Sequence, residues 1–522
     1  MSASDEITCA DKCTDIREKI GKVCIVVKGM SPCGDFQLTT AKVRGHDLKT
    51  WKSITPALGQ TYEDCMKQWG NRLWLVYEET RISFKQGEEI MVAFAAQLQK
   101  EFDIKKGDKV GIAMRNFPEF LLAFLGITYM GGVAVPLNSM WKTDEFEYAV
   151  KDSEMKVLIG DFERLQVCQP FLGGLGVKSI IVRGTAAQKE ETGAQAAWED
   201  MIAAGKQLPR PSYKNIDFED EAMIMYTSGS TGFPKGVVHT QRSVGACMKL
   251  GKLAALLTPE EESKALMAVP MFHITALGNT CLFSLPAGNA ILMMRKWDAG
   301  EALKMIEKEK ATRFTGVPTM VRDMFEHPNF KAEAFASMKN IAAGGAPVPP
   351  SLMAKVRKAG SKPAQGYGLT ETMGAVAINN GVDYKRHPTS CGKPIPLVVQ
   401  AAIKDPATGK TLKDGERGEL CIKSHFNMKG YQNRPEDTAK VIDSEGFFHT
   451  GDIAKMEGGG SFSSWTGSRI SSSAEARTSI VRRWRLVSTR TRRSESALCL
   501  ASQMRGWGRW SAALCTHSPA RT

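Results

Sequence analysis

Short apolar runs alternate with stretches of helical spacing through most of this chain. The pattern predicts strands at residues 110–114, 157–159, 180–182, 265–269, 290–294 and 313–317, with helices such as 119–129 and 241–257 between several of them. Alternating strands and helices build mostly parallel sheets that helices cover on both faces. With 43% hydrophobic residues among 522, the chain can bury the cores of such sheets. We therefore expect a globular α/β protein.

One segment carries the clearest chemical signal. Residues 223–239 read MIMYTSGSTGFPKGVVH, an apolar run followed by hydroxyl residues, glycines and a lysine. Glycines let backbone amides approach an anion, hydroxyls donate hydrogen bonds, and the lysine adds a positive charge. The predicted polyphosphate-binding residues are Thr227, Ser228, Gly229, Ser230, Thr231, Gly232 and Lys235. The alternative is a Ser/Gly-rich surface turn, which has no need of four hydroxyls and a lysine together.

The spacing of this loop differs from G-x-x-x-x-G-K-[ST], which disfavours the usual P-loop nucleotide hydrolases. Further motifs follow in order: PMFH at 270–273, GGAP at 344–347, QGYGLTE at 365–371, GEL at 418–420 and FHTGD at 448–452. Together with the loop they resemble the adenylate-forming superfamily, which includes acyl-CoA synthetases, luciferases and peptide-synthetase adenylation domains. The resemblance extends over residues 61–457.

The resemblance implies a large N-terminal domain of two α/β sheet subdomains plus a distorted β-barrel. It divides the chain into a leader (1–50), an AMP-binding adenylation domain (51–456) and an aberrant Arg/Ser-rich tail (457–522). That tail stands where the family has a small C-terminal α+β domain with a catalytic lysine. The expected small domain is therefore missing from the sequence as written.

The resemblance also assigns roles within the motifs. Lys235 and the loop would hold the β- and γ-phosphates of ATP, Thr370 would donate to the α-phosphate, and Glu371 would bind Mg²⁺, which prefers carboxylate and phosphate oxygens. Asp452 would bind the ribose, and Tyr367 would stack on adenine. The remaining implied nucleotide-binding residues are Gly344, Gly345, Ala346, Gln365, Gly366 and Gly368. As alternatives, Glu371 caps or pairs on the surface, Tyr367 is a core aromatic, and Asp452 is a turn aspartate.

His273 occupies a position that borders the acyl pocket and thiol channel in this family, and we include it among the candidate catalytic residues; a satisfied core histidine is the alternative. The implied reaction is an ATP-dependent ligation of a carboxylic acid to coenzyme A, with ATP, Mg²⁺ and coenzyme A required. Likeness to fatty-acid ligases around 116–119 and 135–138 favours a CoA ligase for fatty or aryl acids over the other branches of the superfamily, and a fatty acid is the expected substrate. A non-catalytic nucleotide or acyl-adenylate binding module, or a truncated pseudoenzyme, is the alternative function.

The tail departs from the family in a way that the genetic code explains. Trp465 and Thr466 are encoded by TGG and ACN, so the shifted frame contains GAC, which encodes aspartate. Continued in this frame, the codons permit D-R-x-K-D and then, over 474–480, G-G-E-N-I, both expected in the family. We hypothesise that the sequence from about Ser463 is translated out of frame. A catalytic lysine is then absent, because Lys455 is the last lysine, and activity of the chain as written is expected to be impaired.

The charge of the chain is concentrated in the same tail. Residues 461–522 contain eleven arginines and two glutamates, which give +9 of the net +13. A tail that binds RNA or membrane is the alternative explanation, but for the main body we expect no nucleic-acid partner. No signal peptide or transmembrane segment is predicted, so an intracellular location, cytoplasmic or organellar, is expected, with peripheral membrane association left open.

Overall fold

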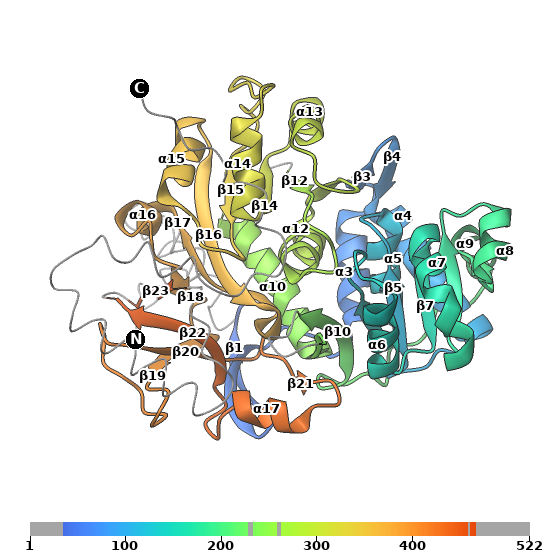
Figure 1. Ribbon diagram of the computed structural model, residues 1–522, viewed down its shortest axis with the longest axis horizontal. Coiled ribbons are helices and arrows are strands. Elements are labelled where there is room, and N and C mark those ends of the chain that lie inside the picture. The colour runs from blue at the N-terminus through green and yellow to red at the C-terminus, as the bar shows by residue number, and fades with distance from the viewer. Residues whose placement is uncertain (1–34, 228–232, 258–262, 458–459, 466–522) are drawn as a thin grey trace, which may run out of the picture.

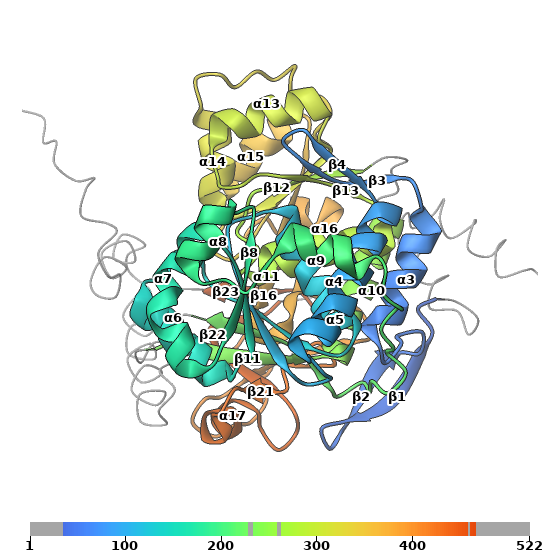
Figure 2. The same cartoon turned by 90° about the vertical axis from the view of Figure 1, so that its right-hand side faces the viewer.

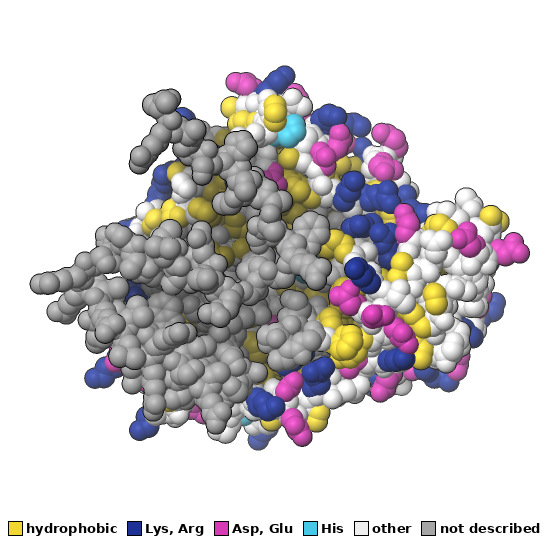
Figure 3. Space-filling view, in the orientation of Figure 1, with side chains coloured by type: hydrophobic (Ala, Val, Ile, Leu, Met, Phe, Trp, Pro, Cys, Tyr) yellow, Lys and Arg dark blue, Asp and Glu magenta, His cyan; other side chains and the backbone are white. Residues whose placement is uncertain are grey.

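The computed structural model of the 522-residue chain describes residues 35–227, 233–257, 263–457 and 460–465. Two large sheets and one smaller sheet form its framework. A separate two-stranded hairpin is the fourth sheet. Figure 1 shows the smaller sheet below the strands β14–β17 and beside the hairpin. On the described part of the surface in Figure 3, basic and acidic side chains are interspersed, as expected for the nearly balanced charge of the main body.

The first large sheet has eight strands in the order β21-β11-β10-β6-β5-β7-β8-β9. Strands β10 through β9 in this order are parallel, whereas β11 and β21 are antiparallel to their neighbours. The strands are β5 (Lys109–Ala113), β6 (Val133–Pro136), β7 (Val157–Asp161), β8 (Lys178–Val182), β9 (Ala196–Ala197), β10 (Glu221–Thr227), β11 (Lys235–Thr240) and β21 (Gly430–Tyr431). The helices α5 (Pro118–Tyr129), α6 (Thr143–Ser153), α7 (Phe162–Leu172), η1 (Gly173–Leu175), α8 (Ala186–Thr192) and α9 (Trp198–Gly205) connect them.

The second large sheet has nine strands in the order β18-β17-β16-β15-β14-β12-β13-β3-β4. Its strands are β3 (Leu73–Tyr77), β4 (Thr80–Ser83), β12 (Lys264–Met267), β13 (Ala290–Met293), β14 (Arg313–Gly316), β15 (Asn340–Ala343), β16 (Lys362–Leu369), β17 (Gly374–Asn380) and β18 (Lys393–Pro394). Its helices are α3 (Leu58–Trp69), α4 (Phe84–Phe102), α10 (Gln241–Leu257), α11 (Ile274–Ala276), the π-helix η2 (Leu277–Leu282), α12 (Phe283–Ala287), α13 (Ala299–Glu309), α14 (Pro318–Glu326), α15 (Pro350–Lys358), η3 (Thr370–Thr372) and α16 (Gly381–Arg386).

The three largest apolar cores of the described residues hold these layers together. The largest lies between the two sheets and includes side chains of α3, α4, α5 and α10 together with residues of both sheets. A second core packs α13–α15 on the outer face of the nine-stranded sheet, and a third packs α6 and α7 on the outer face of the eight-stranded sheet. Figures 1 and 2 show the same order of layers. Helix α5 shows why the layers take this order. Every residue of α5 except Glu119 is buried, as expected for a helix enclosed between sheets.

The region expected to be a distorted barrel is a four-stranded antiparallel sheet, β19 (Val399–Lys404), β20 (Arg417–Ser424), β22 (Phe448–Met456) and β23 (Phe462–Trp465). Helix α17 (Pro435–Val441) lies between β21 and β22 in the chain. The hairpin β1 (Leu38–Val43) and β2 (His46–Trp51) packs against this sheet, since the buried Trp51 ring meets those of His425 and Phe426 edge-on at 5.3 and 5.8 Å. Figure 2 shows the hairpin beside α17 and β21 at the bottom of the molecule.

The strands and helices predicted from periodicity are confirmed to within a few residues, and so is the α/β fold class. The β1–β2 hairpin lies almost wholly before the predicted domain boundary at residue 51, within the expected leader. Among the described residues, no helix is both long and apolar enough to cross a membrane. The cysteines of the described part of the chain, Cys65, Cys168, Cys247, Cys281, Cys391 and Cys421, are buried free thiols.

Candidate active site

The predicted phosphate loop connects two antiparallel strands at the edge of the eight-stranded sheet. Thr227 at the end of β10 faces Lys235 at the start of β11, and its Oγ1 donates a 3.4 Å hydrogen bond to the Lys235 carbonyl oxygen. The pairing closes the base of the loop, so both ends of the predicted anion site are fixed by the sheet. Ser228, Gly229, Ser230, Thr231 and Gly232 lie outside the described residues.

Lys235 already has an anionic partner. Its Nζ lies 2.8 Å from Asp437 Oδ2 on α17 and 5.1 Å from the centroid of the Tyr431 ring. The hydrogen bond and charge of Lys235 lower the pKa of the Asp437 carboxyl. The hydrogen bond and charge of Lys440 lower it further. The side chains of Lys235 and Asp437 are 18% and 26% exposed, so the ion pair stands at the edge of solvent.

The same tyrosine also reaches Glu371, the predicted Mg²⁺ ligand. Tyr431 Oη donates a 2.9 Å hydrogen bond to Glu371 Oε1, and the Met428 amide donates a 2.8 Å bond to the Glu371 carbonyl oxygen. Glu371 follows β16 in the short helix η3 and is only partly exposed. The structure therefore brings the predicted phosphate lysine and the predicted metal carboxylate to one side chain, which the sequence analysis did not identify.

Thr370 is held through its main chain by a buried histidine. His239 Nε2 lies 2.7 Å from the Thr370 carbonyl oxygen, so this nitrogen carries the proton and donates, while Nδ1 lies 3.2 Å from Ser243 Oγ. Burial lowers the pKa of His239 to about 4, with the Thr370 bond acting in the opposite direction. The imidazole is therefore neutral near pH 7. A lone histidine at the end of an apolar strand was the available signal for this contact.

Tyr367 and Asp452 bind each other. Tyr367 Oη donates a 2.7 Å hydrogen bond to Asp452 Oδ2, and the two residues are each 6% exposed. The ring of Phe462 meets that of Tyr367 edge-on at 5.4 Å. In this structure Tyr367 therefore occupies a core position, the alternative considered above. A stacking contact with adenine and a contact of Asp452 with ribose stay predictions.

The glycine-rich segments lie on adjacent strand ends. Gln365 in β16 pairs with Ala343 in β15, and this places the segment 344–346 beside β16. Gly344 is required by close packing, since a Cβ there would lie 2.9 Å from the Gly366 carbonyl oxygen. The other implied nucleotide-binding residues of this segment, Gly345 and Ala346, follow in the same loop. Gln365 is 9% exposed, and its buried Oε1 accepts no hydrogen bond within the described part of the chain.

Gly368, one of the implied nucleotide-binding residues, serves backbone packing. A Cβ at Gly368 would lie 1.9 Å from the Gly374 carbonyl oxygen in the adjacent strand β17. The register of β16 and β17 shifts between Tyr367 and Gly368, as in a β-bulge. The glycine is thus explained by the close approach of two backbones.

His273 is the remaining predicted site residue. It precedes α11, its side chain is exposed, and its ring lies 4.6 Å from that of Phe272. Its carbonyl oxygen accepts the amides of Ala276 and Leu277 at 3.0 and 3.1 Å. A satisfied core histidine does not describe this exposed side chain, and its role in the acyl site stays a prediction.

A second histidine supports the turn before Asp452. His449 Nδ1 lies 2.9 Å from Glu419 Oε2, and the other oxygen of Glu419 accepts the Gly451 amide at 3.0 Å. Burial disfavours the charged imidazole, but the bonds and charges of Glu419 and Asp443 raise the pKa of His449. The GEL and FHTGD motifs thus meet in space, and together they fix the position of Asp452.

The same place brings three metal-binding residue types together. Ligand atoms of Glu419, Cys421 and His449 lie within 4.8 Å of one another. Both oxygens of Glu419 already accept hydrogen bonds, and Cys421 Sγ lies 3.7 Å from the Glu419 carbonyl oxygen. The group is satisfied within itself, so we assign it a structural role.

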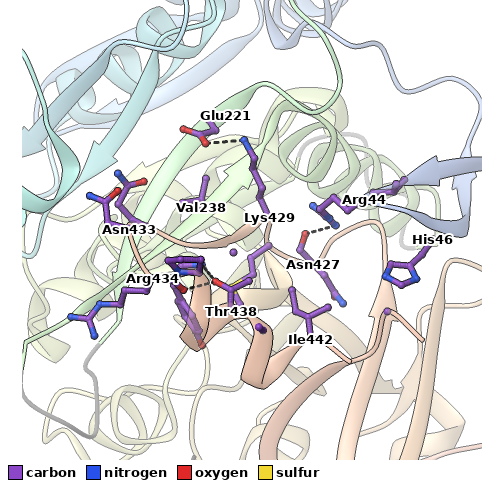
Figure 4. Close-up of a pocket in the computed structure, with 18 of the residues that line it drawn as sticks. Arg44, His46, Glu221, Val238, Asn427, Lys429, Asn433, Arg434, Thr438 and Ile442 are labelled. Atoms are coloured by element: carbon purple, nitrogen blue, oxygen red, sulfur yellow. Dashed lines mark hydrogen bonds and ion pairs between the residues drawn. The ribbon is translucent and has the colours of Figure 1, made fainter. Parts of the chain in front are cut away.

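A pocket of about 640 Å³ opens between the β1–β2 hairpin, β21 and α17. Figure 4 shows Arg44 and His46 on one side and Arg434 and Thr438 on the other. None of the predicted site residues lines it. Tyr431, which contacts both Lys235 and Glu371, does line it, so the pocket adjoins the candidate site.

Comparison with known proteins decides the family. The sequence model of the AMP-binding enzyme family matches residues 62–432. The chain belongs to this family. A feruloyl-CoA synthase of Amycolatopsis is 31% identical over 360 residues, 69% of this chain and 68% of that protein. A long-chain-fatty-acid–CoA ligase of Bacillus subtilis is 30% identical over 380 residues, 69% of this chain and 67% of that protein.

Solved structures agree with this assignment. A crystal structure of the N-terminal domain of FACL13 from Mycobacterium tuberculosis matches with a TM-score of 0.66 and 28% identity, over 78% of this chain and 98% of that one. A long-chain-fatty-acid-CoA ligase from Archaeoglobus fulgidus, at 23% identity and a TM-score of 0.70 over 78% of this chain and 83% of that one, supports the fold. The adenylate-forming resemblance, the acyl-CoA synthetase class and the N-terminal-domain fold are thereby confirmed.

Proposed function

We propose that this chain activates a carboxylic acid as its acyl-adenylate with ATP and transfers the acyl group to coenzyme A, with a fatty acid as the acid. The observation that carries the proposal is the meeting of Lys235 and Glu371 at Tyr431, beside the closed base of the phosphate loop. A cation for phosphate and a carboxylate for a metal thus stand together. Lys235 and Glu371 come from two motifs far apart in the sequence. Neither motif by itself predicts that the two side chains contact the same tyrosine.

The residues present fit the groups that the reaction needs. Lys235 can bind the phosphates of ATP and stabilise the charge that develops on pyrophosphate as it leaves. The partly exposed carboxylate of Glu371 is the kind of oxygen ligand that Mg²⁺ prefers. When bound there, Mg²⁺ would neutralise phosphate charge. His239 would keep the Thr370–Glu371 segment in place through the Thr370 carbonyl.

The nucleoside end of the site has fitting partners as well. The buried Gln365 Oε1 lacks a donor within the described residues, and the exocyclic amino group of adenine would supply one. Asp452 Oδ2 is used by Tyr367, while a carboxylate has two oxygens and can accept several hydrogen bonds. A ribose hydroxyl can therefore bind Asp452 without displacing Tyr367.

The identity of the acid is a separate part of the proposal. The relatives include enzymes named for feruloyl-CoA, 4-coumarate and long-chain fatty acids, all near 30% identity. A long-chain fatty acid is our proposed substrate, because the sequence likeness around 116–119 and 135–138 is to fatty-acid ligases. Hydroxycinnamic acids are the competing class.

The test has two stages, both with the full chain. Equilibrium binding of ATP is first measured with and without Mg²⁺, for the wild type and for Lys235→Met and Glu371→Gln. We expect each substitution to weaken Mg²⁺·ATP binding by roughly tenfold or more, the loss that follows removal of a charged partner. Absence of ATP binding by the folded wild-type chain would refute the proposal.

Pyrophosphate release is then measured with a long-chain fatty acid, a short-chain fatty acid and ferulate, each with coenzyme A. Release that depends on a fatty acid supports the ligase. ATP binding without release with any acid favours the non-catalytic binding module, which the absence of lysine after Lys455 makes a specific alternative. Release with ferulate alone would assign the aryl class.

A further inference from the structure

Tyr431 and Asp437 are brought to Lys235 by one compact turn. Tyr431 is in β21, which pairs with β11 so that Tyr431 faces Val237, two residues after Lys235. Side chains two residues apart share a face of a strand. The ring of Tyr431 therefore lies on the same face as Lys235, with its hydroxyl extended to Glu371.

A threonine ties this tyrosine to helix α17. The Tyr431 amide donates a 2.8 Å hydrogen bond to Thr438 Oγ1, which donates a 2.9 Å bond to the Arg434 carbonyl oxygen. Figure 4 shows Thr438 and Arg434 in this turn. Asp437, the residue before Thr438, thereby presents its carboxylate to Lys235 at 2.8 Å. The Thr438 hydroxyl, bonded on both sides to the backbone, thus holds the turn that carries Asp437.

The magnitudes indicate which partner Lys235 keeps when nucleotide arrives. An ion pair at the edge of solvent contributes little, typically below about 1 kcal/mol. Asp437 offers a single negative charge that it shares with Lys440 at 3.2 Å and Arg434 at 3.7 Å. A polyphosphate carries several charges, so it outcompetes this carboxylate for Lys235. Stacking over the Tyr431 ring remains available to the ammonium in either state.

We propose that Asp437 and Tyr431 are positioning residues of the nucleotide site: Asp437 holds Lys235 in the nucleotide-free chain and yields it to phosphate, while Tyr431 orients Glu371 for the metal. This inference rests on the proposed function. Asp437 therefore lowers the affinity for nucleotide, and Tyr431 raises it only when Mg²⁺ is present.

The first experiment measures Mg²⁺·ATP affinity at equilibrium for Asp437→Asn, with Glu436→Gln as the matched control. Glu436 is the exposed neighbour of Asp437 on α17 and carries the same charge. We expect Asp437→Asn to tighten binding up to about fivefold, as follows from freeing an ion-paired cation, and Glu436→Gln to change it by less than about twofold. In a Lys235→Met background the effect of Asp437→Asn should disappear.

The second experiment compares Tyr431→Phe with Tyr213→Phe, a distant tyrosine whose hydroxyl also contacts a carboxylate, Glu63 Oε2 at 3.2 Å. Tyr431→Phe keeps the ring under Lys235 but removes the hydroxyl from Glu371. We expect on the order of tenfold weaker ATP binding with Mg²⁺ and unchanged binding in EDTA. A general structural defect would weaken ATP binding both with Mg²⁺ and in EDTA.

The outcomes separate the inference from the function on which it rests. If the wild type binds no ATP, the proposed function fails. If the wild type binds ATP but Asp437→Asn and Tyr431→Phe behave like their controls, the inference is overturned and the proposed function stands. Persistence of the Asp437→Asn effect without Lys235 would also overturn it, because the effect would then be general electrostatics.

Discussion

The hydroxyl of Tyr367 donates a 2.7 Å hydrogen bond to the carboxylate of Asp452, 85 residues away in the chain. The contact joins the nine-stranded sheet to the four-stranded sheet, since Tyr367 lies in β16 and Asp452 in β22. Burial, followed by the charge and hydrogen bond of Asp452, holds the pKa of Tyr367 well above its usual range. The phenol therefore stays protonated as a donor.

Replacement of Tyr367 by Phe should destabilise the folded chain. A buried carboxylate would lose its donor, which typically costs about 1–3 kcal/mol. The free energy of unfolding measured in urea should fall by this amount. Tyr213→Phe, which removes a longer contact at a half-exposed site, should cost less than about 1 kcal/mol. Equal losses of unfolding free energy for the two substitutions would show that the buried Tyr367–Asp452 bond stabilises the fold no more than the half-exposed contact of Tyr213.

Gly368→Ala should be more damaging than its small size suggests. The added Cβ would lie 1.9 Å from the Gly374 carbonyl oxygen, so β16 and β17 would have to separate. We expect a loss of about 3 kcal/mol in unfolding free energy. Gly173→Ala is the control, because Gly173 has a helical φ of −61° and no atom within 4 Å of the added group. It should be neutral or stabilising by up to about 1 kcal/mol, and a similar loss at both sites would contradict the packing explanation.

The two fully buried histidines should make the chain sensitive to acid. Burial lowers the pKa of His239 to about 4 and that of His425 to about 3, against 6.5 for an exposed imidazole. Between these values and 6.5 the unfolded chain binds more protons than the folded chain. The unfolding free energy therefore falls as pH falls through this window, by up to about 1.4 kcal/mol per pH unit for each histidine.

Unfolding free energies of His239→Gln between pH 6.5 and 5 test this assignment. Glutamine can still donate to the Thr370 carbonyl but does not titrate, so roughly half of the acid-dependent loss should remain, from His425. Tyr213→Phe, which leaves every imidazole in place, should keep the wild-type slope. An unchanged slope in His239→Gln would mean that the imidazole already titrates normally in the folded chain.

The frame change proposed near Ser463 is decided by the transcript. Strand β23 pairs with β22 through Trp465, and the residues after Trp465 lie outside the described part of the chain. Sequencing the transcript across codons 455–522 should recover a frame encoding D-R-x-K-D and then G-G-E-N-I. Confirmation of the printed frame would mean a real truncating frameshift instead of an error in the gene model, and pyrophosphate release by the natural protein should then be impaired.

Much of the fold followed from local patterns. Apolar runs located β5, β7, β8, β12, β13 and β14, because buried parallel strands need continuous apolar sequence. The motifs supplied Lys235, Glu371 and Asp452 by residue type and order. The β1–β2 hairpin was not predicted, since it is stabilised by packing against the distant His425 and Phe426 rings.

By itself, then, the sequence determined the kind of chemistry: hydroxyls, glycines and a lysine in one loop, and a carboxylate suited to a metal. Only the tertiary structure decided which groups act on one another. Tyr431 reaches Glu371 across 60 residues, and His239 reaches Thr370 across 131. Such contacts depend on how strands are ordered in a sheet, and strand order is set by the burial of whole layers. Sequence periodicity indicates only which face of each strand or helix is buried, so it does not predict which distant residues contact each other.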